Sequence, residues 1–135
     1  MIISLVVAVI VHSFIYFTGI YWIDQIDILA FLGLIYLLPV LTNAVLTFIA
    51  AWTKKPVKVS YLLLPAISFI NYIILSLTLQ GDEGWAGFVN RNTVSDAGMT
   101  ITVNENLLSF SQILFVALLY FIIQYVSILI VRRSK

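Results

Sequence analysis

The sequence predicts an all-α integral membrane protein in which four transmembrane helices form an antiparallel bundle with both termini cytoplasmic. Hydrophobic residues make up 62% of the 135 residues and charged residues only 10%, a balance that soluble globular domains do not show. The apolar residues also form four long runs, each sufficient to cross a hydrocarbon core of about 30 Å. The chain has room for one domain, residues 1–135.

The four predicted spans are residues 2–23, 28–52, 57–79 and 107–131. Tyr21 and Trp22 lie near the end of the first span, where aromatic rings favour the headgroup region. The polar turn 24–27 is so short that the first two spans are expected to pack against each other. Pro39 lies near the middle of the second span, and a helix kink is expected about one turn before it.

Residues 80–106 form the one substantial predicted extramembrane segment, an outer loop. Its acidic residues are Asp82, Glu83, Asp96 and Glu105. They lack the spacing of an EF-hand, which favours a solvated loop over one that binds a peptide or a cation. Residues 100–103 alternate with a period of two and predict a short strand. Trp85 and Phe88 are expected to dip into the lipid headgroups.

Positive charge predicts the orientation of the spans. Six of the seven Lys and Arg residues lie on one predicted side of the membrane: Lys54, Lys55, Lys58, Arg132, Arg133 and Lys135. Arg91 alone lies on the other side. Because positively charged loops resist translocation, the side with six Lys and Arg residues is expected to be cytoplasmic. The membrane itself is expected to be the cell membrane. These residues are interpreted chiefly as topology determinants, and secondarily as an inner contact surface for a partner or for anionic headgroups.

The composition of the spans argues against several functional classes. Apart from Lys58 at an inner edge, the spans contain no Asp, Glu, Lys or Arg, which ion-coupled transporters and voltage sensors commonly bury. Intramembrane hydrolases need a nucleophile–base set, a carboxylate pair or a metal site. No cysteine and a single histidine exclude thiolate and multi-histidine metal sites within one chain. We therefore expect no enzyme, no metal and no cofactor, and a net charge of +1 gives no reason to expect nucleic-acid binding.

Neutral polar residues remain inside the predicted bundle, and they are the candidate binding residues: His12, Asn43, Asn71 and Gln124. Each lies on a mildly polar stripe at helical spacing. Counted from the inner ends, His12, Asn43 and Gln124 fall within about 5 Å of one another in height, with Asn71 higher. We interpret them as one hydrogen-bonded layer between the helices. A polar pocket or pathway for a ligand, a proton or a headgroup is the alternative.

Part of the chain resembles a known family. Ile26-Asp27-Ile28-Leu29-Ala30, Leu38-Pro39-Val40 and Leu46-Thr47-Phe48 resemble the staphylococcal Msa family, small membrane proteins of Gram-positive bacteria named as modulators of the SarA regulator. The layout of spans, basic inner turn, outer loop and basic C-terminus is similar too. The resemblance implies a membrane-embedded regulatory or signalling role, and it carries over no catalytic residue.

On these grounds we expect a non-enzymatic modulator in the lipid bilayer that acts through contacts with another membrane protein or with further copies of itself. One alternative is a small transport or channel component whose conduit is lined by the four neutral polar residues. Another is an immunity protein that protects against a membrane-active toxin.

Overall fold

The computed structural model describes residues 1–53 and 56–134. Lys54, Lys55 and Lys135 therefore lie outside the described residues. In chain order the elements are α1 (Ile2–Tyr21), α2 (Ile28–Leu32), the π-helix η1 (Gly33–Leu37), α3 (Leu38–Trp52), the 3-10 helix η2 (Val59–Leu62), α4 (Leu63–Leu79), α5 (Glu83–Asn92), β1 (Val94–Asp96), β2 (Met99–Ile101) and α6 (Phe110–Arg133).

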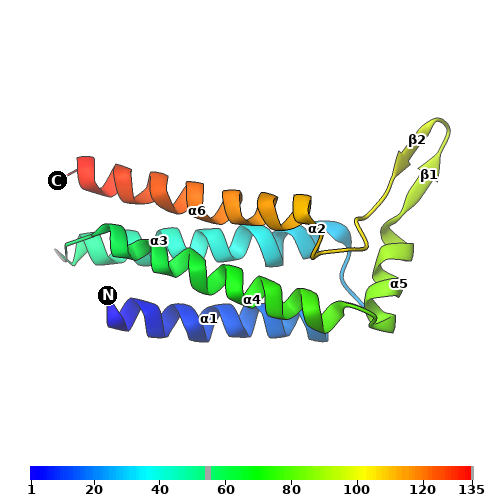
Figure 1. Cartoon of the computed structure of the whole chain (residues 1–135), viewed down its shortest axis with the longest axis horizontal. Coiled ribbons are helices and arrows are strands. Elements are labelled where there is room, and N and C mark those ends of the chain that lie inside the picture. The colour runs from blue at the N-terminus through cyan, green and yellow to red at the C-terminus, as the bar shows by residue number, and fades with distance from the viewer. Residues whose placement is uncertain (54–55, 135) are drawn as a thin grey trace.

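Four helical segments are long and apolar enough to cross a membrane: Ile2–Tyr21, Ile28–Trp52, Val59–Leu79 and Phe110–Arg133. This confirms the largely helical fold class and the presence of four helices able to cross a membrane, with bounds that differ from the predicted spans by up to about three residues. The segments lie along the long axis of the molecule, with both chain ends at one end of that axis and α5 and the strands at the other (Figure 1). Both α1 and α6 pack against α3 and α4.

The second span changes helix type just before Pro39, where the kink was expected. Proline has no N–H, so Pro39 cannot bond to the carbonyl of Ile35 as an α-helix would require. The preceding segment Gly33–Leu37 is a π-helix, the form that occurs as single-turn bulges within α-helices. A side chain of α6 binds the freed carbonyl: the Tyr120 hydroxyl donates to Ile35 O over 2.5 Å.

Pro65 in α4 frees a second carbonyl, that of Tyr61 in η2. Gln124 Nε2 donates to this oxygen over 3.2 Å. Because Tyr120 and Gln124 lie one turn apart on α6, a single face of that helix binds both freed carbonyls. The neighbouring helix α6 thus supplies the hydrogen-bond donor that each proline lacks, which is how membrane bundles accommodate proline within a span.

The predicted outer loop contains a folded cap, α5, over the bundle. Asp82 begins the helix by accepting the N–H of Trp85 over 3.2 Å. Trp85 and Phe88 pack on Phe31 of α2, with ring centroids 5.7 and 5.0 Å from it. They are 5% and 0% exposed, so the expectation that these rings dip into headgroups is wrong. Their apolar area is better buried against the bundle, which keeps α5 folded.

Arg91 and Asn92 at the end of α5 hold the turn between the first two spans. Arg91 Nη2 donates to the carbonyls of Ile23 and Ile26 over 3.1 and 3.0 Å. Asn92 Oδ1 accepts the N–H of Ile28 over 2.9 Å. Arg91, the one basic residue at this end among residues 1–53 and 56–134, therefore binds backbone oxygens that would otherwise need another donor.

The two strands form an antiparallel hairpin beyond α5 (Figure 1), with Val94 opposite Ile101 and Asp96 opposite Met99. Gly98 in the turn has a φ of 92°, which glycine adopts without steric cost. The strand expected at 100–103 is found as Met99–Ile101. Its partner strand and α5 were not predicted.

Candidate functional site

The interior of the bundle contains a hydrogen-bonded cluster from three helices. His12 Nε2 lies 2.8 Å from Asn43 Oδ1 and 3.0 Å from Ser68 Oγ. Asn43 Nδ2 donates to Ser68 Oγ over 2.8 Å. The three side chains are at most 1% exposed. The cluster joins α1, α3 and α4 by polar contacts that lipid cannot replace.

Gln124 connects α6 to this cluster through Thr47. Its Nε2 donates to Thr47 Oγ1 over 2.8 Å, and Thr47 Oγ1 donates to the carbonyl of Asn43 over 2.9 Å. Gln124 is 2% exposed and Thr47 is fully buried. The structure therefore brings His12, Asn43 and Gln124 into one continuous network of hydrogen bonds, which we call the polar layer together with Ser68 and Thr47.

Asn71 does not reach the polar layer. It is half-buried, and its Nδ2 donates to the carbonyl of Ile67 on its own helix over 3.0 Å. Ser68, three residues earlier, is the α4 member of the layer. Both residues lie on the polar stripe that the sequence shows, but Asn71 lies about 4.5 Å further along α4 than Ser68, and it bonds its own helix instead.

A second set of polar contacts, made by tyrosines, lies nearer to α5 than the polar layer. The hydroxyls of Tyr16 and Tyr120 are 2.6 Å apart. Tyr72 donates to the carbonyl of Leu107 over 2.9 Å. Gln112 on α6 donates to the Tyr36 hydroxyl. These tyrosines were not among the predicted site residues, although Tyr16 and Tyr120 share stripes with His12 and Gln124 and could have been found on that basis.

These two sets of contacts are suited to holding helices together. Apart from Gln112, which is half-buried, their members are buried, and the donors named above bond to protein acceptors within the bundle. Among residues 1–53 and 56–134 no group of three or more His, Cys, Asp or Glu side chains is placed to hold a metal ion. The contact between Ser68 Oγ and His12 Nε2 pairs a hydroxyl with an imidazole, but both residues are fully buried.

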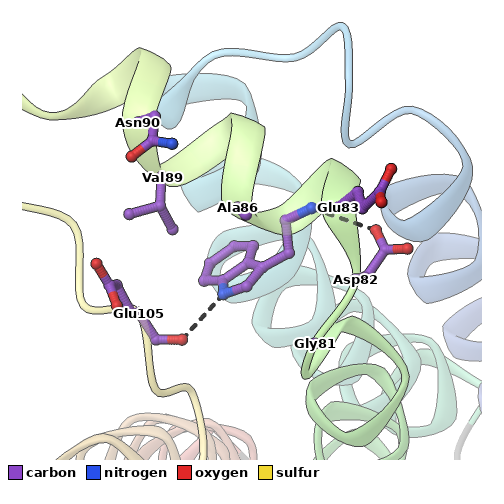
Figure 2. Close-up of a pocket in the computed structure, with 8 residues that line it drawn as sticks. Gly81, Asp82, Glu83, Ala86, Val89, Asn90 and Glu105 are labelled. Atoms are coloured by element: carbon purple, nitrogen blue, oxygen red, sulfur yellow. Dashed lines mark hydrogen bonds between the residues drawn. The ribbon is translucent and has the colours of Figure 1, made fainter.

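A cleft of about 490 Å³ opens beside α5, and we call it the outer cleft. It is lined by Gly81, Asp82, Glu83, Trp85, Ala86, Val89, Asn90 and Glu105. Figure 2 shows Glu105 on the segment that leads to α6, and Asp82 and Glu83 at the start of α5 on the opposite side of the view. Trp85 Nε1 donates to the carbonyl of Glu105 over 2.9 Å, which ties the two walls together.

The outer cleft is acidic. The side chains of Asp82, Glu83 and Glu105 are exposed, and none of the described lining residues is basic. Charge of one sign along a concave surface raises the local concentration of ions of the opposite sign. The outer cleft therefore favours a cationic group over an anionic one.

The candidate inner contact residues lie at the other end of the molecule. Lys58, Arg132 and Arg133 are exposed. Arg132 and Arg133 occupy the last turn of α6, where positive charge complements the helix dipole. Lys54 and Lys55, the other predicted contact residues, lie outside the described residues.

Another hollow lies on the side of the bundle, within the segments that could span a membrane. It has a volume of about 350 Å³ and is lined by Leu29, Leu32, Gly33, Tyr36, Leu37, Val40, Leu119 and Ile123. Its lining is almost wholly apolar, as expected for a surface that contacts acyl chains.

Comparisons of the chain with protein-family models, with curated proteins and with solved structures gave no match. The resemblance to the Msa family stays a prediction.

Proposed function

We propose that this protein is a non-enzymatic, multi-pass protein of the cell membrane that modulates a partner membrane protein by binding it at the outer cleft. The observation that carries the proposal is the acidic outer cleft on a cap that is folded onto the bundle. The Msa resemblance supports the regulatory role and a Gram-positive source. The closed polar layer supports the view that the spans form a scaffold for this cap.

The proposal includes an antiparallel bundle with both termini cytoplasmic, which places the outer cleft outside the cell. The distribution of Lys and Arg supports this orientation. Arg91, the one exception to that distribution, binds the carbonyls of Ile23 and Ile26. Its presence on the outer side therefore has a structural reason and does not weaken the charge argument.

Cysteine labelling tests the orientation, because the natural chain contains no cysteine. Two single-cysteine variants, Ala97→Cys in the hairpin turn and Ser134→Cys at the C-terminal end, are exposed to a membrane-impermeant maleimide in intact cells. We expect labelling at position 97 without permeabilisation and labelling at position 134 only after it. The reverse pattern would contradict the orientation and would move the outer cleft to the cytoplasm.

The partner that fits the outer cleft is a protein segment carrying Lys or Arg next to the membrane surface. Three carboxylates line the cleft, and complementary charge speeds association and selects against acidic partners. Each exposed ion pair contributes only about 0.2–1 kcal/mol. The contact must therefore also bury part of the outer cleft, and it should weaken as the salt concentration rises.

Site-specific photo-crosslinking tests this function. A photoreactive amino acid replaces Ala86, which lines the outer cleft, and in a control it replaces Gly87, which is exposed on the same helix and does not line it. We expect one membrane protein to be captured from position 86 and not from position 87. Recovery of no common protein from position 86, after crosslinking in intact cells, would refute the proposal.

A charge-removing variant makes the test specific. Asp82→Asn, Glu83→Gln and Glu105→Gln together remove the acidic charge but keep side-chain size, and Asn caps a helix about as well as Asp. Capture from position 86 should then fall strongly while expression and helical content stay unchanged. Undiminished capture by this variant would show that charge in the outer cleft does not select the partner.

The transport alternative has less support. A conduit through the predicted lining residues would have to pass the polar layer, whose side chains are at most 2% exposed. Purified protein in liposomes is expected to conduct neither ions nor small solutes, and a flux that changes in His12→Ala would favour the conduit instead.

A further inference from the structure

The amide of Gln124 has only one possible orientation in the polar layer. Its Nε2 faces the carbonyl of Tyr61, which can only accept a hydrogen bond. It also faces Thr47 Oγ1, whose own hydrogen is donated to the carbonyl of Asn43. If the amide nitrogen and oxygen were exchanged, Gln124 Oε1 would face two oxygens, Tyr61 O and Thr47 Oγ1, and neither would have a hydrogen to donate to it. Gln124 Oε1 therefore points elsewhere, and it has no hydrogen-bond partner among residues 1–53 and 56–134.

The tautomer of His12 follows from the orientation of the Asn43 amide. Asn43 Nδ2 donates to Ser68 Oγ, so Asn43 Oδ1 is the atom that faces His12 and needs a donor. His12 Nε2 carries the hydrogen, and His12 Nδ1 is a bare acceptor. Within the described part of the chain, His12 Nδ1 also has no hydrogen-bond partner.

The two unpaired acceptors belong to residues at a similar height along the bundle. The hydroxyls of Tyr16 and Tyr120 are in contact, and His12 and Gln124 each lie one turn from these tyrosines. Because the two chain ends lie at the same end of the long axis (Figure 1), both turns lead in the same direction. His12 and Gln124 are 0% and 2% exposed, so the region is closed to the surroundings.

We propose that this region is a binding site for enclosed water, with at least one water molecule donating hydrogen bonds to His12 Nδ1 and Gln124 Oε1. An unpaired buried acceptor costs about 1–3 kcal/mol, and buried water typically makes about three hydrogen bonds to groups of this kind. A water molecule supplies two donors and no charge. The closed surroundings exclude a side chain from a partner, and two neutral acceptors are too few to coordinate a cation.

Nuclear magnetic resonance of the protein in lipid nanodiscs tests this site, because the chain has a single histidine. The ¹⁵N shifts should show a neutral ring with Nε2 protonated and Nδ1 bare. Magnetisation should pass from water to the His12 ring and to the Gln124 side chain. A protonated Nδ1, or no transfer from water to either side chain, would overturn the proposal.

Two variants and one additive separate enclosed water from bulk water. Gln124→Met removes one acceptor and should abolish or strongly reduce the transfer at His12. Gln112→Met on the same helix, which breaks the bond to Tyr36, should leave the transfer unchanged. A soluble paramagnetic chelate should not broaden the His12 ring signals. Broadening would mean that bulk water enters the bundle, and it would overturn the enclosed site. This measurement needs only the natural protein, so it remains decisive if Gln124→Met fails to fold.

Discussion

Replacing Tyr120 by Phe tests whether the hydroxyl on α6 compensates for Pro39. The substitution keeps the ring of a residue that is 1% exposed and removes one oxygen. That oxygen donates to the carbonyl of Ile35 and contacts the hydroxyl of Tyr16. Since Tyr120 gives its hydrogen to the carbonyl, Tyr16 must be the donor in the second contact.

The expected cost follows from these two contacts. A hydrogen bond between helices in a membrane is worth about 0.6 kcal/mol on average and up to about 1.7. In addition, the carbonyl of Ile35 would be left without its Tyr120 donor, and Pro39 cannot supply one. A buried unsatisfied group costs about 1–3 kcal/mol. Tyr120→Phe should therefore lower the free energy of unfolding by about 1–3 kcal/mol.

Reversible unfolding in mixed micelles, followed by tryptophan fluorescence, measures this change. Tyr125→Phe is the matched control, because Tyr125 lies on the same helix and is 50% exposed. It should change stability by less than about 0.5 kcal/mol. Tyr16→Phe should cost less than Tyr120→Phe, since Tyr120 would still donate to Ile35. Equal stability of the Tyr120 and Tyr125 variants would refute the role assigned to the hydroxyl.

Two further predictions concern contacts between elements. Gly19→Ala should destabilise the bundle by about 1–3 kcal/mol, because an added Cβ would lie 2.9 Å from Cδ1 of the fully buried Ile35. Gly33→Ala is the control, since its Cβ would meet nothing within 4 Å and should not destabilise the bundle. Equal unfolding midpoints for the two variants would contradict this prediction. Arg91→Ala should raise amide hydrogen exchange in the turn whose carbonyls it binds, while Asn90→Ala on the same helix should not. Unchanged exchange in the Arg91 variant would show that the Arg91 contacts do not hold this turn.

Much of the fold is predictable because it follows from composition and local pattern. The four spans show as long runs without charge, and Pro39 predicts a local change in its helix because the missing N–H is a property of the residue itself. The polar layer is predicted in part. His12, Asn43 and Gln124 stand out because a polar side chain in a span needs a partner, whichever partner that is.

The members that were missed or misplaced are those whose role depends on distant residues. Ser68 is a small hydroxyl that could equally bond its own helix, and only the positions of His12 and Asn43 give it a wider role. Asn71 has the larger amide but lies further along α4 and bonds its own helix. The helix α5 was missed because its apolar residues are few, and burial of Trp85 and Phe88 requires Phe31 from another segment.

Hydrophobic length and the lack of charge thus predict four helices able to cross a membrane before any contact between them is known, because each helix can satisfy its own backbone hydrogen bonds. Contacts between segments that are distant in sequence depend instead on how the helices rotate and pack. Tertiary packing directs Tyr120 and Gln124 to the carbonyls freed by Pro39 and Pro65, folds α5 onto the bundle, and creates the outer cleft. Those contacts carry the functional proposals, since the runs of apolar residues alone would allow many rotations of each helix.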